Sequence, residues 1–176
     1  MLNKMFLVTQ RLTLGMSHPT ITLFHVTSVE RAINITISQR FEPFNSSPAA
    51  PDSGLNAGIV GEPLSSQKFE HHGAKLIMEW SGPVIKGAIS DNPFPLPIDT
   101  LYNALPWRVV VSHGTTQYLR AVDIQCSDQA LMEDARHPWY CLTEGMRERW
   151  KVSELKKRRE RIKRLVKDKP SICVKP

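Results

Sequence analysis

Seven cationic side chains lie within nine consecutive residues near the C-terminal end of the chain, from Lys156 to Arg164, with Glu160 as the one acidic residue among them. Lysine and arginine neutralise phosphate, and arginine does so with paired hydrogen bonds. Like charges three and four residues apart repel each other on a helix, and a polyanion would relieve that cost. The residues predicted to bind a polyanion are Lys151, Lys156, Lys157, Arg158, Arg159, Arg161, Lys163, Arg164 and Lys167.

The net positive charge of the chain is confined to this one end. The net charge is +6, but residues 147–176 hold 13 of the 23 basic and 4 of the 17 acidic residues, which gives +9. Residues 1–146 hold the other 10 basic and 13 acidic residues, which gives −3. Such concentration is typical of proteins that bind nucleic acid or an anionic membrane. The alternative is a solvated helix face. Cations on several sides of one helix favour phosphate contacts without sequence preference.

Other chemistry has little support in the sequence. Zinc could in principle bind to Cys126, His137 and Cys141, but these residues include no CxxC pair, and the sequence offers no clear fourth ligand. Residues 112–114 (SHG) lack the setting of a serine nucleophile, and the chain contains neither a phosphate-binding loop nor a dinucleotide fingerprint. The sequence therefore predicts no catalytic residue, no metal and no cofactor. A small hydrolase or metal enzyme ranks below the binding functions.

Three aromatic residues, Trp139, Tyr140 and Trp150, lie just before and inside the basic segment. Aromatic side chains of this kind anchor in lipid headgroup regions or stack on nucleic-acid bases. The alternative is that they pack the basic helix onto the body of the protein. The sequence leaves these possibilities open.

The cations require a helix to position them. Residues 144–167 are rich in Arg, Lys, Glu and Leu, which are strong helix formers, and 24 helical residues span about 36 Å. Val152, Leu155, Ile162 and Val166 follow one another at spacings of 3, 7 and 4, which predicts a narrow apolar stripe. We therefore expect one stripe of this helix to dock while the rest faces outward.

The N-terminal part of the body is predicted from alternation and composition. Residues 20–27 and 32–38 are rich in β-branched residues, with Ile alternating with polar residues in the second segment, and so they predict a β-hairpin. Residues 43–66 are rich in Pro, Gly, Ser and Ala and predict a flexible linker. The resulting domain prediction is an arm with a hairpin (1–42), the linker, a core (67–142) and a basic helical tail (143–176).

The predicted core contains strands and two short helices. Strands are expected at 74–80, 84–90, 107–112 and 117–126, the last two as a hairpin, with helices at 98–105 and 127–135, the second capped by Ser127. The predicted fold is therefore α+β, a small mostly antiparallel sheet with two or three helices and a basic C-terminal helix.

The middle of the chain resembles the core of rhabdovirus matrix proteins, particularly the small ones of plant-infecting members. The resemblance is carried by the strand AKLIMEW, the segment NPFPLPIDTLYNALPW, and the strands RVVVS and QYLRAVDIQC. It covers about 50 residues and is a pattern of elements rather than a motif. It implies a structural protein of the virion or host cytoplasm. Unlike that family, this chain carries its basic run C-terminally and has no PPxY sequence.

These observations predict a non-enzymatic assembly protein that self-associates and binds ribonucleoprotein or anionic membrane through its basic tail. Three cysteines without framework spacing favour reduced thiols and an intracellular location. The alternative is a mitochondrial ribosomal protein with the tail along rRNA. The first 29 residues contain no Asp or Glu and carry Lys4 and Arg11, which is similar to a mitochondrial presequence, although an N-terminal arm that packs on the body explains them equally well.

Overall fold

The computed structural model of the chain describes residues 19–41, 54–68, 73–87, 100–112, 114–115 and 117–167. These residues form an α+β fold, as the sequence predicts. The strands are β1 (Ile21–Thr27), β2 (Arg40–Phe41), β3 (Gly54–Ile59), β4 (Ala74–Trp80), β5 (Val84–Lys86), β6 (Leu101–Leu105), β7 (Arg108–Ser112), β8 (Gly114–Thr115) and β9 (Leu119–Cys126). The helices are α1 (Val29–Ser38), α2 (Pro63–Lys68), α3 (Asp128–Met132) and α4 (Glu144–Lys167).

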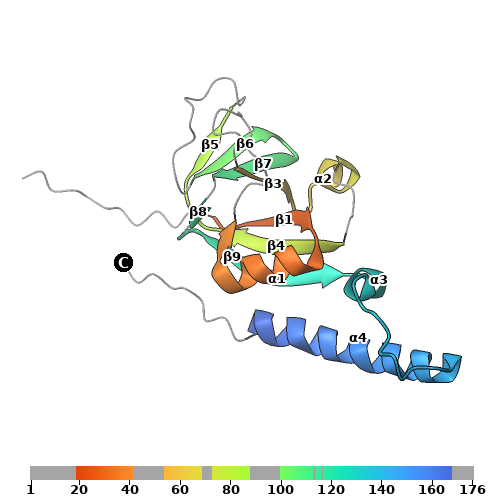
Figure 1. The fold of residues 1–176 in the computed structure, drawn as a ribbon. Helices are drawn as coiled ribbons and strands as arrows, with labels where there is room; N and C mark the ends of the chain where they lie inside the picture. The colour runs from red at the N-terminus through yellow and green to blue at the C-terminus, as the bar shows by residue number, and fades with distance from the viewer. Residues whose placement is uncertain are drawn as a thin grey trace, which may run out of the picture.

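Seven strands form one sheet in the order β5-β6-β7-β3-β1-β4-β9, and β2 pairs with β8 in a separate ribbon (Figure 1). All pairs in the large sheet are antiparallel except β5 with β6. Strand β1 lies between β3 and β4, with Phe24 opposite Gly58 and Leu23 opposite Met78. The first described strand is therefore central in the sheet, not part of a separate arm.

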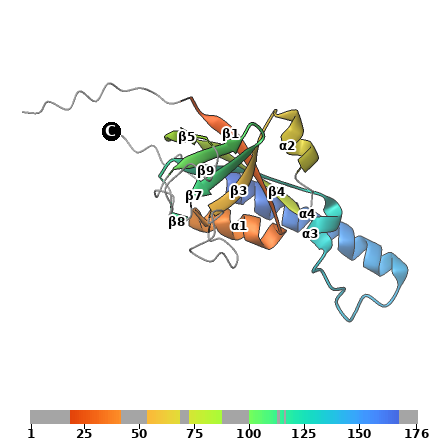
Figure 2. The ribbon, with the colours of Figure 1, turned by 90° about the horizontal axis from the view of Figure 1, so that it is seen from above.

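Helices α1 and α4 lie on the same side of the sheet, where α1 packs on β4 and β9 and α4 packs on β9, α1 and α3 (Figures 1 and 2). Strand β4 alternates buried and half-buried residues along its length. The core beneath the helices joins residues from most of the strands with residues from three helices. Its members include Leu23, Ala32, Leu55, Leu76, Met78, Trp80, Val111, Leu131 and Ile162.

The segment predicted as the second strand of a hairpin is instead the helix α1. Ser28 caps it by accepting a hydrogen bond from the backbone N–H of Arg31 at 3.2 Å. Ala32 and Thr36 are buried four residues apart, so the face that contacts the sheet has helical spacing. The alternation of isoleucines suggested a strand, but Ile37 is half exposed. The cap and the helical spacing outweigh the strand preference of the isoleucines.

The predicted flexible linker is wrong for residues 54–66, which contain β3 and most of α2; residues 43–53 lie outside the described residues. The glycines that suggested a linker allow close approach between strands. A Cβ at Gly54 would lie 2.5 Å from the carbonyl oxygen of Val111. Ser65 of α2 is fully buried, and its hydroxyl accepts a hydrogen bond from Ile59 N and donates one to the Trp107 carbonyl.

The predicted helix at 98–105 is also wrong, because residues 101–105 form β6 between β5 and β7; residues 98–99 lie outside the described residues. Leu101 and Tyr102 are adjacent and both fully buried, so both faces of this strand are covered. The Tyr102 hydroxyl donates a hydrogen bond to the Gly87 carbonyl oxygen at 2.5 Å. Burial on both faces of the strand accounts for the adjacent Leu101 and Tyr102, whereas Leu105 is 42 % exposed.

The strands predicted at 74–80, 107–112 and 117–126 are confirmed, with β7 and β9 one or two residues shorter at the start. The hairpin between the last two is wrong, because β7 pairs with β3 and β6 while β9 pairs with β4. The strand at 84–90 is confirmed for 84–86; residues 88–90 lie outside the described part of the chain. The helix predicted at 127–135 is confirmed as α3 with its Ser127 cap, which accepts from Ala130 N at 3.1 Å, but it ends at Met132.

His25 on β1 is a partly buried titratable group in the centre of the sheet. Its Nδ1 donates a hydrogen bond to the Asn56 carbonyl oxygen at 2.7 Å, which bridges β1 to β3. Burial lowers the pKa of His25 below its ordinary value of 6.5; the Asn56 hydrogen bond opposes this shift, and the charge of Arg31 adds to it. The folded protein therefore disfavours the charged imidazolium.

We expect the free energy of unfolding to fall as the pH decreases below 6.5, because the unfolded chain then binds a proton that the folded chain resists. Above pH 6.5 this contribution to stability is fully present. Urea unfolding on either side of that pH measures it. His25→Asn keeps a donor for the Asn56 carbonyl and should flatten the profile in this range. An unchanged profile in this variant would show that another group is responsible.

Candidate polyanion-binding surface

Helix α4 has the bounds that the sequence predicts, and its ends are matched to its charges. Thr143 caps it, since its hydroxyl accepts a hydrogen bond from Met146 N at 3.3 Å. Glu144 lies in the first turn and Arg164 and Lys167 in the last, which suits the helix dipole at both ends. The N-terminal end of the helix projects past α3 in both views (Figures 1 and 2).

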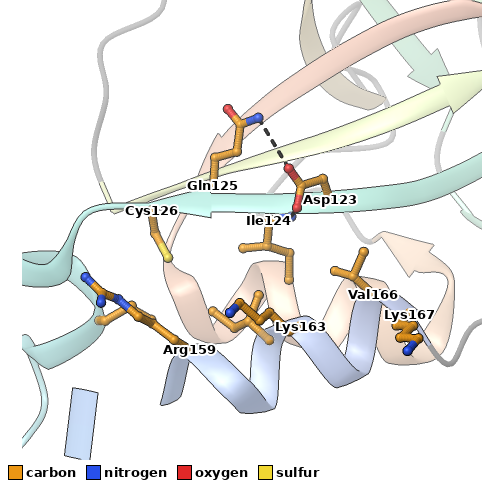
Figure 3. Close-up of a pocket in the computed structure, with 10 residues that line it drawn as sticks. Asp123, Ile124, Gln125, Cys126, Arg159, Lys163, Val166 and Lys167 are labelled. Carbon is orange, nitrogen blue, oxygen red and sulfur yellow. Dashed lines mark hydrogen bonds between the residues drawn. The ribbon is translucent and has the colours of Figure 1, made fainter. Parts of the chain in front are cut away.

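One face of α4 docks on the body through an apolar seam. Ile162 is 7 % exposed, and Leu155 and Val166 are half-buried against the same core. Ile162 and Val166 line, with Ile124 of β9, a hollow of about 550 Å³ between the helix and the edge of the sheet (Figure 3). The predicted stripe is thus confirmed for three of its four residues. Val152 is 69 % exposed and does not belong to the seam.

Two of the nine predicted polyanion-binding residues are engaged with the body. Arg158 donates hydrogen bonds from Nη1 to the Leu131 carbonyl oxygen at 2.7 Å and to the Asp134 carboxylate. Arg159 makes a paired contact with both carboxylate oxygens of Asp128. The hydrogen bond between Arg158 and Asp134 is the main cause of two pKa shifts. It lowers the pKa of Asp134 and raises the pKa of Arg158. These arginines fix how α4 sits on α3.

Three further predicted cations pair with carboxylates on their own helix. Lys151 contacts Glu148 at 2.6 Å, Lys163 contacts Glu160 at 3.3 Å, and Lys157 lies 4.0 Å from Glu154. The hydrogen bond with Glu148 is the main cause of the raised pKa of Lys151. Such exposed pairs contribute little to stability, so these lysines are available to a stronger anion.

The face of α4 opposite Ile162 carries exposed cations along most of its length. With 3.6 residues per turn, Arg149, Lys156, Arg164 and Lys167 fall on this outer face at spacings of 7, 8 and 3. All four are exposed, and none lies within 4.0 Å of a carboxylate among the residues that the structure describes. From Arg149 to Lys167 the outer face runs about 27 Å.

Arg149 was not predicted as a site residue, although its position seven residues before Lys156 places both on one side of a helix. The predicted residue Arg161 is exposed beside the outer face. It lines a shallow hollow of about 580 Å³ together with Lys156, Lys157 and Arg164, and Glu160 is the one carboxylate there. Four cations around one hollow suit an anion of phosphate size.

The residues weighed as zinc ligands do not gather. Cys126 lies on β9, Cys141 is buried in the segment before α4, and His137 packs edge-to-face on Trp150 with ring centres 5.3 Å apart. Among the described residues, no three His, Cys, Asp or Glu side chains are grouped to hold a metal ion. Burial raises the pKa of Cys126, and the negative charges of Asp128 and Asp123 raise it further. The thiol is therefore less reactive than an exposed one.

Comparisons with known proteins give no family for this chain. No protein-family model, curated protein or solved structure matched it. Within the described residues, none of the helices is long and apolar enough to cross a membrane. The resemblance to matrix proteins stays a prediction.

Proposed function

We propose that this chain is a non-enzymatic assembly protein that binds a polyanion, either the phosphates of a ribonucleoprotein or an anionic lipid surface, through the outer face of α4. Self-association, expected of such a protein, is part of the proposal. The observation that carries the proposal is the division of α4 into two faces. Its inner face is docked through Ile162, Arg158 and Arg159, while its outer face presents cations with few carboxylates.

A solvated helix needs no such division. If the charges of α4 served solubility alone, acidic and basic residues would be equally useful on the outer face. Here the acidic residues of α4 are paired with cations, as in the contacts of Glu148, Glu154 and Glu160. The excess charge is therefore concentrated on a rigid surface, where it neutralises phosphates without the cost of ordering a flexible tail.

Binding of the full chain to an RNA duplex and to vesicles containing phosphatidylserine, across a series of salt concentrations, tests the proposal. If about six cations contact the duplex, the logarithm of the binding constant should fall against that of the salt concentration with a slope of about −5. Lys156→Glu/Arg164→Glu should weaken binding by roughly 30-fold or more, since each cation near an anionic surface contributes about 1 kcal/mol.

The matched control is Arg40→Glu/Lys86→Glu, which changes the net charge equally at exposed residues of β2 and β5. It should retain most of the affinity, because neither residue lines the hollow formed by Lys156, Lys157, Arg161 and Arg164. Equal losses in the two variants would show that net charge, not the outer face, drives binding. Binding that is insensitive to salt would contradict the proposal altogether. Sedimentation over a range of concentrations tests self-association separately.

A further inference from the structure

Large apolar side chains are exposed where the chain enters α4. Trp139 is 88 % exposed, Leu142 76 %, Tyr140 49 % and Met146 42 %. The two aromatic residues alone present on the order of 300 Å² of surface to solvent. We call these four residues the apolar tip. Exposed apolar groups that adjoin one another on a soluble protein mark a contact surface.

The segment that carries the apolar tip is held in place. Cys141 is buried, its N–H bonds the Pro138 carbonyl oxygen at 3.0 Å, and its own carbonyl accepts from Nε of Arg147 at 3.2 Å. The His137 ring packs edge-to-face on Trp150 of α4. The small and polar groups of the segment therefore anchor it, while its largest apolar side chains point outward. Folding alone would favour the opposite arrangement, with the large apolar side chains buried.

The apolar tip adjoins the cationic outer face through Met146. Met146 lies three residues before Arg149 and ten before Lys156, which places it on the same side of the helix. Other charged residues in the first turns of the helix neutralise one another, since Arg147 lies 3.7 Å from Glu144 and Lys151 contacts Glu148. This side of the helix thus passes from the apolar Met146 to the cations of the outer face.

Resting on the proposed function, we propose that the polyanion is an anionic bilayer and that the apolar tip inserts into its headgroup region. A bilayer offers both an apolar layer and a negative surface, so it complements both halves of this surface. Trp and Tyr favour that region. RNA would match the rings and the cations but not the aliphatic Leu142 and Met146. The rings of Trp139 and Tyr140 meet at 81°, with centres 6.0 Å apart, so they do not form a parallel stacking platform.

The test compares two surface variants of the full chain on three probes: vesicles of phosphatidylcholine, the same vesicles containing phosphatidylserine, and an RNA duplex. Trp139→Ala/Leu142→Ser removes the most exposed part of the apolar tip. It should weaken partitioning onto the phosphatidylserine vesicles by at least about tenfold and leave the RNA affinity unchanged. Val60→Ser/Leu64→Ser, at exposed apolar residues beyond β3, is the matched control and should change neither.

The outcomes separate this inference from the proposed function. Lys156→Glu/Arg164→Glu should weaken binding to RNA and to vesicles alike, whereas the tip variant should affect vesicles alone. A blue shift of tryptophan fluorescence on adding vesicles, reduced in the tip variant, would place Trp139 in the headgroup region. Vesicle binding by the tip variant equal to that of the wild type would overturn insertion. An equal loss of RNA affinity would indicate base stacking in its place.

Discussion

Ile162→Asp is expected to lower the free energy of unfolding by about 3 kcal/mol or more and to release α4 from the body. Ile162 is 7 % exposed and belongs to the main core, so aspartate would bring an unpaired charge into the seam. Release of the helix avoids that cost but exposes Leu131 and Val166. Urea unfolding measures the loss, and hydrogen exchange shows whether the amides of α4 lose protection.

Val152→Asp provides the control on the same helix. Val152 is 69 % exposed, so the same chemical change should shift the free energy of unfolding by no more than about 0.5 kcal/mol. Similar losses in the two variants would mean that aspartate disfavours the helix itself and that docking of Ile162 contributes little. Retained exchange protection throughout α4 in Ile162→Asp would contradict docking of the helix through Ile162.

Gly58→Ala is expected to destabilise the protein by about 2–3 kcal/mol, because the added methyl group has no room. A Cβ at this position would lie 2.4 Å from the Phe24 ring, which is itself 3 % exposed and crosses from the neighbouring strand β1. Thermal or urea unfolding measures the effect. The control is Gly145→Ala near the start of α4, where a Cβ meets nothing within 4 Å and helix propensity favours alanine.

A double-mutant cycle isolates the cause of that loss. Phe24→Leu removes the ring edge that the new methyl group would meet. The combined variant with Gly58→Ala should therefore lose less stability than the two single losses added together. Strict additivity would show that the cost comes from the backbone of Gly58 in the strand, not from its contact with Phe24.

Local sequence patterns predicted the elements that depend least on contacts with distant parts of the chain. Helix α4 was predicted with its bounds because 24 residues of strong helix formers define it without help from the fold. Strand β4 was predicted because every second residue of a half-buried strand is apolar and faces the core, which leaves a visible alternation in the sequence. Ser127 predicted the start of α3 because capping is a local hydrogen bond.

The errors fall where neighbours in space decide the structure. Gly54 and Gly58 suggested a linker, yet each glycine is needed for close approach to Val111 or Phe24, which come from other strands. Leu101 and Tyr102 suggested a helix because nothing in the local sequence shows that both faces of β6 are covered. Pairing between distant strands supplies the information that local patterns lack.

The candidate site was predicted as a segment but not as a surface. The sequence located the cations, but it could not show that Asp128 and Asp134 on the α3 side would engage Arg159 and Arg158. Nor could the sequence show which cations contact the body and which face outward, because this depends on which stripe of α4 packs on β9. The apolar tip was noticed as aromatic residues beside the helix, but their exposure follows only from the fold.

The position of β1 has a consequence for how the chain is made. The strand is among the first described elements to leave the ribosome, yet both of its partners, β3 and β4, are synthesised later, and β9 and α4 later still. Non-local pairing of this kind is slow, on the order of milliseconds to seconds in sheet-rich domains. The nascent chain must therefore hold an unpaired apolar strand during synthesis, and its cationic surface becomes rigid only when α4 closes over the finished sheet.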